Sequence, residues 1–179
     1  MSNQWKAGQT FLLITGASRG LGKAFSIAMA KQLSGGDVIY LTARSEEALL
    51  ITKSDIMTKN DSLRVESFVI DQEKAEKHTY VNMMKNIDPN NFNSAVIIHN
   101  AGSIGKQGQS VSDYDEREEL CSYYNLNLIS VAVLNSVFMK TFAHGRNQKT
   151  LIKMQFKCKI KIHLTSNIKQ HSFLQQIKL

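Results

Sequence analysis

A short apolar segment that runs directly into three spaced glycines constrains this chain more than any other feature. Residues 11–14 read Phe-Leu-Leu-Ile, and Thr15-Gly-Ala-Ser-Arg-Gly-Leu-Gly22 follows them. This order is typical of a buried strand, a tight turn and a helix whose free N–H groups point at the turn. Glycines there let the backbone approach a pyrophosphate, so the segment predicts a dinucleotide site. A purely structural turn is the alternative.

The remainder of the chain alternates between short apolar runs and helical patterns. The apolar runs are rich in Val, Ile, Leu and Phe and lie at residues 11–14, 38–41, 65–70 and 95–98. Helices are expected after Gly22, from Ser45 as a cap, over about 72–86 and over about 113–140. Strands buried on both faces, alternating with helices, predict an α/β fold with a Rossmann-type, doubly wound parallel sheet in a three-layer arrangement. Its ligand site should lie at the carboxyl ends of the strands.

The pattern changes after Thr150. From there lysines alternate with apolar residues, and a Gln-, Ser- and Asn-rich end follows. Such alternation suits a strand with one solvated face, whereas a central parallel strand should be apolar on both. We therefore expect a Rossmann domain over residues 1–150 and a divergent basic tail over 151–179, in which one strand precedes a disordered end.

The charge distribution argues against nucleic-acid binding by the folded part. The net charge is +7, but residues 151–179 hold six lysines and no acid, which leaves +1 for residues 1–150. We interpret the lysines as a solvated tail; binding of nucleic acid or an acidic surface by the tail is the alternative. No apolar run or leader pattern indicates a membrane segment or secretion, so a cytoplasmic protein without membrane partners is expected. The spacing of Cys121 and Cys158 indicates free thiols and no metal site.

Two arginines indicate which dinucleotide is bound. Arg44 stands at the end of the second expected strand, where a site for NAD would place an acid. Arg19 lies within the glycine turn, and two guanidinium groups can hold a 2′-phosphate through bidentate hydrogen bonds. The pair predicts NADP(H), while a solvated loop charge is the alternative for Arg19.

The ends of the other expected strands supply further candidate contacts. Thr15 and Ser18 offer hydroxyls to the phosphates or stabilise the turn. After the third strand, Asp71 could accept a hydrogen bond from the adenine amino group or cap the next helix. Asn100-Ala-Gly102 ends the fourth strand against the ribose, or forms a plain turn.

These motifs together resemble the short-chain dehydrogenase/reductase superfamily. Within it, Thr42–Leu49, Asn100–Gly105 and Tyr124–Ser130 resemble the sepiapterin reductase family, and the likeness runs from about Phe11 to about Ile152. The resemblance implies NADPH-dependent reduction of a pterin side-chain carbonyl in tetrahydrobiopterin biosynthesis, by a homodimer. It matches Asn127 to the helix asparagine of a proton relay, for which a helix-packing amide is the alternative. The expected cofactor contacts are Gly16, Ala17, Ser18, Arg19, Gly20, Leu21, Gly22, Arg44, Ser45, Asp71, Gln72, Asn100, Ala101 and Gly102.

One part of the family pattern is missing from the sequence. The resemblance implies a Ser on the fifth strand and a Tyr-x-x-x-Lys on the next helix, yet none of the five tyrosines has a lysine four residues later. Ser166 is a faint substitute for the serine. We expect a truncated product whose sheet is incomplete at its C-terminal edge, which lacks one of the family's two dimer helices and which keeps NADPH binding without turnover. A catalytically silent, regulatory NADPH-binding fragment and another short-chain carbonyl reductase are the alternatives.

Overall fold

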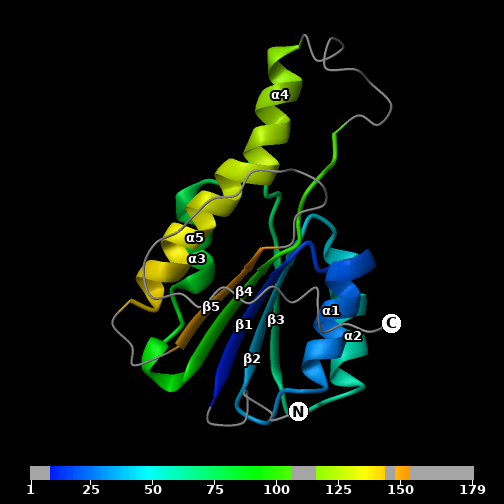
Figure 1. The fold of residues 1–179 in the computed structure, drawn as a ribbon. Helices are drawn as coiled ribbons and strands as arrows, with labels where there is room; N and C mark the ends of the chain where they lie inside the picture. Colours follow the sequence, from blue (N-terminus) through cyan, green and yellow to red (C-terminus); the bar gives the residue numbers. More distant parts are fainter. Residues whose placement is uncertain (1–8, 106–115, 144–147, 154–179) are drawn as a thin grey trace.

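A five-stranded parallel sheet forms the centre of the molecule (Figure 1). The computed structural model describes residues 9–105, 116–143 and 148–153. The strands are β1 Thr10–Thr15, β2 Val38–Ala43, β3 Arg64–Val69, β4 Ser94–His99 and β5 Gln148–Lys153. They lie in the order β3-β2-β1-β4-β5, and every neighbouring pair is parallel. The four apolar runs are thus strands of one sheet, which confirms the predicted fold class.

Helices cover both faces of this sheet. They are α1 Gly20–Ala30, α2 Glu46–Met57, α3 Lys77–Met84, α4 Arg117–Tyr124 and α5 Ser130–Thr141, with a short 3-10 helix η1 at Pro89–Asn91. Helices α1 and α2 pack on one face, and α3 and α5 pack on the other (Figure 1). The arrangement has the three layers predicted from the alternation of strands and helices.

The central strand β1 shows why these strands read as continuous apolar runs. Phe11 and Leu13 belong to the buried cluster beneath α3 and α5, whereas Leu12 and Ile14 belong to the cluster beneath α1 and α2. Successive side chains of a strand point to opposite faces, so a strand covered on both faces needs an apolar residue at every position. All six residues of β1 are buried.

The third helix begins later than the sequence predicts. The expected start near Gln72 is wrong, because α3 begins at Lys77 with Glu76 as its N-cap. The preceding residues form a turn, in which the Glu73 N–H donates to Asp71 Oδ1 over 3.1 Å and the Lys74 N–H donates to the Asp71 carbonyl over 3.1 Å. A carboxylate that satisfies a nearby backbone amide gives the chain an alternative to helix.

The long helix expected up to Lys140 is interrupted in the structure. Between α4 and α5 the residues Asn125–Ile129 form a π-helical turn, η3. Single π turns inside helices occur often at functional sites, and nothing in the apolar spacing predicts one here. The expected start near Asp113 lies outside the described residues.

The sheet continues past Thr150. β5 pairs with β4 from Ser94 opposite Gln148 to His99 opposite Lys153. The strand expected at the start of the tail is therefore part of the same sheet, while the rest of that tail, with Cys158 and Ser166, lies outside the described residues. Within the described ranges, no helix has the length and apolar character that crossing a membrane requires.

Candidate cofactor site

The glycine turn after β1 is packed so tightly that two of its positions require glycine. Gly16 has φ +66°, and a Cβ there would lie 2.9 Å from Asn100 Nδ2. A Cβ on Gly22 would lie 2.2 Å from the Gly16 carbonyl oxygen and 2.4 Å from Asn100 Nδ2. Both glycines therefore serve the contact between the turn, the first turn of α1 and the end of β4.

The other side of the turn is open. Gly20 has φ +56°, and a Cβ there would meet no atom within 4 Å. Arg19 and Gly20 are exposed, Leu21 is 44% exposed and Ser18 is half-buried. Helix α1 begins at Gly20, has no acid in its first turn, and receives no hydrogen bond from a side-chain cap. The start of α1 thus has no side-chain cap and lies beside open space at Gly20, an arrangement that fits the phosphates of a dinucleotide.

Hydrogen bonds from the end of β4 hold the turn in place. The Asn100 and Ala101 N–H groups donate to Thr15 Oγ1 over 3.1 and 3.0 Å. Asn100 Nδ2 donates to the carbonyl oxygens of Thr15 and Gly16 over 3.2 and 3.0 Å. Thr15 is buried, so its hydroxyl stabilises the turn, which is the second of the two roles that the sequence left open.

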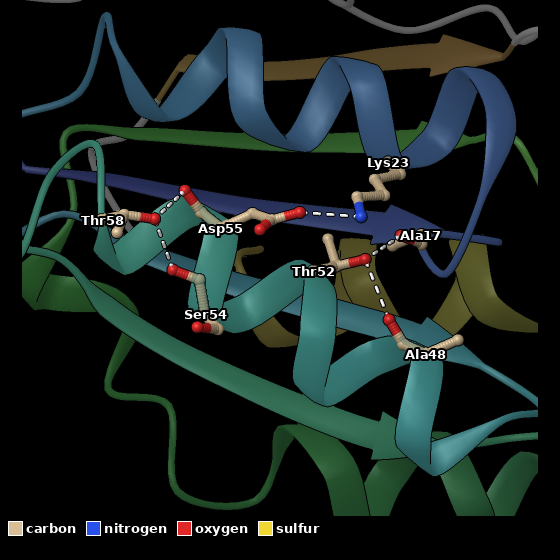
Figure 2. A network of polar contacts seen from close by, with 7 residues as sticks. All are labelled: Ala17, Lys23, Ala48, Thr52, Ser54, Asp55 and Thr58. Atoms are coloured by element: carbon tan, nitrogen blue, oxygen red, sulfur yellow. Dashed lines mark hydrogen bonds and ion pairs between the residues drawn. The ribbon is translucent and has the colours of Figure 1, made fainter.

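Helix α2 also contacts the glycine turn, through a hydrogen bond to Ala17 (Figure 2). The buried Thr52 Oγ1 lies 3.1 Å from the Ala17 carbonyl oxygen and 3.0 Å from the Ala48 carbonyl oxygen. The Ala17 N–H donates to the Thr42 carbonyl of β2 over 3.1 Å. Sequence reasoning missed Thr52, because a threonine inside a helix carries no local signal of a tertiary contact.

A salt bridge links α1 to α2 near the glycine turn (Figure 2). Lys23 Nζ lies 2.7 Å from Asp55 Oδ2, and both side chains are partly exposed. Exposed pairs of this kind contribute only about 0.2–1 kcal/mol. The turn is thus held mainly by the buried hydrogen bond of Thr52 and the partly buried hydrogen bonds of Asn100.

The two arginines lie near the carboxyl ends of β1 and β2. Arg19 immediately precedes α1, Arg44 immediately follows β2, and both are exposed. Neither forms a salt bridge with a residue that the structure describes. Ser45 is the N-cap of α2, as predicted, and its Oγ accepts a hydrogen bond from the Ala48 N–H over 3.3 Å.

The residues after β3 divide between surface and core. Asp71 is half-buried in the turn that precedes α3. The N-cap of α3 is Glu76, so the alternative in which Asp71 caps this helix is wrong. Gln72 is only 5% exposed, and its Nε2 donates to Thr42 Oγ1 over 3.0 Å. Its Oε1 accepts from Tyr80 Oη over 2.7 Å. Burial, reinforced by the charge of Asp71, raises the pKa of Tyr80 to about 12.

The π turn places Asn127 against the loop after β4. Asn127 Oδ1 accepts from the Ser103 N–H over 3.1 Å, and its Nδ2 donates to the Tyr123 carbonyl over 2.9 Å. A Cβ on Gly102 would lie 3.0 Å from Asn127 Oδ1. The helix-packing role is therefore present, and it brings Asn127 to the strand end that carries Asn100-Ala-Gly102.

A partly buried polar pair, which the sequence analysis did not single out, lies at this strand end. His99, the last residue of β4, is 2% exposed, and its Nε2 lies 2.6 Å from Asn135 Oδ1 on α5. It directly follows the apolar run at residues 95–98, and no local sequence pattern indicates its partner on α5. Across the described residues, no group of three His, Cys, Asp or Glu side chains could hold a metal ion.

Known proteins with similar sequences cover most of this chain but only part of their own length. Rat sepiapterin reductase is 27% identical over 156 residues, which are 86% of this chain and 60% of that protein. Benzil reductase ((S)-benzoin forming) of Bacillus subtilis is 29% identical over 145 residues, 79% of this chain and 53% of that protein. The chain thus spans little more than half of the length of these relatives.

Solved structures share the fold. L-sorbose reductase from Gluconobacter frateurii, complexed with NADPH and L-sorbose, superposes with a TM-score of 0.66 at 21% identity, over 82% of this chain and 52% of that one. A short-chain dehydrogenase from Sphingobium yanoikuyae in complex with NADPH has a TM-score of 0.63 at 21% identity, over 79% and 52%. The short chain dehydrogenase family model matches residues 10–154. The sheet, the glycine turn and this match establish that the chain belongs to the short chain dehydrogenase family.

Proposed function

We propose that the chain binds NADPH at the carboxyl ends of β1, β2 and β4. The observation that carries the proposal is the glycine turn, which is fixed on its inner side by Asn100 and Thr52 and open at Gly20. The turn and the start of α1 would hold the pyrophosphate, because backbone N–H groups point there. Two structural neighbours were solved with NADPH, which supports the same cofactor here.

The remaining contacts follow from the strand ends. Arg19 and Arg44 are exposed and free of described salt bridges, so both are available for a 2′-phosphate. The Asp71 carboxylate would receive the adenine amino group, and Asn100-Ala-Gly102 would line the ribose side. This arrangement favours NADPH over NADH, because NADH lacks the phosphate that the arginines bind.

The reaction that we propose this NADPH site serves is sepiapterin reductase-like reduction of a pterin side-chain carbonyl in tetrahydrobiopterin biosynthesis, in the cytoplasm. The similarity to rat sepiapterin reductase supports this substrate class. NADPH supplies the hydride in such a reduction. The contribution of this chain is to orient the cofactor, with Asn127 placed next to Gly102 as a relay residue.

A proton donor for this reduction is not evident in the sequence. Carbonyl reduction needs a donor whose pKa a nearby cation lowers, and the 179 residues contain no tyrosine with a lysine four positions later. We therefore propose that this polypeptide, by itself, binds NADPH without turnover. A regulatory, catalytically silent NADPH-binding protein is the second candidate that the same observation favours. Reduction of a different carbonyl is the third, supported by the similarity to benzil reductase.

Two measurements test the proposal. Fluorescence titration of the purified chain should show tighter binding of NADPH than of NADH, and equal affinities would remove the argument from the two arginines. The absorbance of NADPH should stay at background when sepiapterin is added to the chain and cofactor. Robust oxidation of NADPH would show that the tyrosine and lysine are not required for turnover.

A further inference from the structure

A buried chain of hydrogen bonds joins α3 to the end of β2, beneath the turn that carries Asp71. The Tyr80 hydroxyl donates to Gln72 Oε1 over 2.7 Å, and Gln72 Nε2 donates to Thr42 Oγ1 over 3.0 Å. Tyr80 and Thr42 are fully buried, and Gln72 is 5% exposed. Water competes little with these bonds, so the three side chains hold one another in a single arrangement.

Two members of this chain of bonds, Thr42 and Gln72, connect it to the proposed cofactor site. The Thr42 carbonyl accepts from the Ala17 N–H of the glycine turn over 3.1 Å. Gln72 is the residue next to Asp71, and its buried side chain anchors the turn in which the Glu73 N–H donates to Asp71 Oδ1. The position of Asp71 therefore depends on where Gln72 is held.

We propose that Tyr80 is a positioning residue for the adenine side of the cofactor site, acting through Gln72 on Asp71. The inference rests on the proposed binding of NADPH. Without the Tyr80 hydroxyl, the Gln72 carbonyl oxygen loses its described donor inside the core, and an unpaired buried polar group is costly. Movement of Gln72 toward solvent relieves that cost, and it displaces Asp71. Gln72 is thus a buried residue that positions Asp71 at the proposed adenine site.

The test is a Tyr80→Phe variant, which removes one hydroxyl and keeps the ring. We would measure dissociation constants for NADPH, for adenosine 2′,5′-bisphosphate and for reduced nicotinamide mononucleotide. Tyr80→Phe should weaken the first two by about the same factor, about 5- to 10-fold, and leave the third unchanged. A uniform loss over all three ligands, or no loss, would overturn the proposal.

Tyr40→Phe is the matched control. Tyr40 is 2% exposed and lies in the same apolar cluster as Tyr80, and its ring packs on Phe68 with the centroids 4.7 Å apart. Its hydroxyl has no described contact with Gln72. All three affinities should stay at wild-type values in Tyr40→Phe, and a loss equal to that of Tyr80→Phe would contradict a specific role of Tyr80.

A double variant separates positioning from general stability. Tyr80→Phe with Gln72→Met removes both partners of the Tyr80–Gln72 bond and leaves only Thr42 Oγ1 without its described donor, so stability should recover part of the loss seen in Tyr80→Phe. The hydrogen bond from residue 72 to Thr42 is absent, however, so Asp71 is not held in place and the affinity for adenosine 2′,5′-bisphosphate should stay low. Recovery of that affinity together with stability would show that the role of Tyr80 is structural only.

Hydrogen exchange without cofactor distinguishes failure of this inference from failure of the proposed function. The Glu73 and Lys74 amides both donate to Asp71, so both should exchange faster in Tyr80→Phe than in the wild type. Unchanged exchange and unchanged affinity overturn the inference alone. Wild-type protein that binds none of the three ligands overturns the proposed function and, with it, this inference.

Discussion

Asn100 Nδ2 donates to the carbonyl oxygen of Gly16 over 3.0 Å, although 84 positions separate the two residues in the chain. The bond fixes the glycine turn after β1 to the end of β4. It also explains why Gly22 cannot carry a side chain, since a Cβ there would lie 2.4 Å from the same Nδ2. The shape of the proposed cofactor site thus depends on contact between the glycine turn, the start of α1 and the end of β4.

Gly22→Ala should destabilise the protein by about 1–3 kcal/mol, because the added methyl group forces the turn or Asn100 to move. Urea denaturation would measure this loss. Gly35→Ala is the control, since a Cβ there meets its nearest atom at 3.6 Å, an ordinary contact, and it should change stability by less than about 0.5 kcal/mol. Equal stability of the two variants would contradict the packing seen at Gly22.

Thr52→Val should destabilise the protein by about 1–2 kcal/mol, because it leaves the buried carbonyl of Ala17 without the Thr52 donor. Thr58→Val is the matched control. Thr58 Oγ1 contacts the Ser54 and Asp55 carbonyls at 2.8 and 2.9 Å, but at the exposed end of the same helix (Figure 2). Water can replace those bonds, so its effect should stay within about 0.5 kcal/mol. Similar losses of stability for Thr52→Val and Thr58→Val in thermal denaturation would argue against a stabilising contact between Thr52 and the glycine turn.

Arg44→Asp should invert the cofactor preference. The substitution removes a guanidinium group from the proposed 2′-phosphate site and introduces an acid that can accept hydrogen bonds from ribose hydroxyls. Loss of a hydrogen bond to a charged group costs about 1.5–3 kcal/mol, so NADPH should bind about 10- to 100-fold more weakly. Titration with both cofactors measures the shift, with Lys53→Asp, on the partly exposed Lys53 of α2, as a charge-matched control. An unchanged ratio of affinities would refute the role of Arg44.

Alkaline pH should destabilise the protein through Tyr80. Its pKa is raised from 10.0 to about 12, chiefly by burial, so the folded protein retains a proton that the unfolded chain loses. Stability from this group is complete below pH 10 and falls as the pH rises toward 12, by about 1.4 kcal/mol for each pH unit. Urea denaturation between pH 9 and pH 12 should show a shallower fall in Tyr80→Phe. The same slope in both proteins would contradict the shift. Tyr40, whose pKa burial also raises, contributes in the same direction in both.

Local sequence patterns determined the fold of this chain and the place of its proposed cofactor site. Apolar runs without polar alternation predict strands covered on both faces, and the glycines after the first run mark the turn where a dinucleotide would bind. The cap of α2 at Ser45 was equally readable, because the hydroxyl and the amide that it caps are three residues apart. Information of this kind lies within a few residues and needs no knowledge of packing.

Tertiary structure alone decided what holds the site together. The contacts of Asn100 with Gly16, Thr52 with Ala17 and Gln72 with Tyr80 join different elements. Asn127, within the π turn, accepts a hydrogen bond from the Ser103 N–H in the loop after β4. The late start of α3 follows from a local bond of Asp71 that competes with helix, and the spacing of apolar residues does not reveal which wins. A buried polar group takes whichever partner the packed elements bring to it, and that partner is set by their arrangement in space.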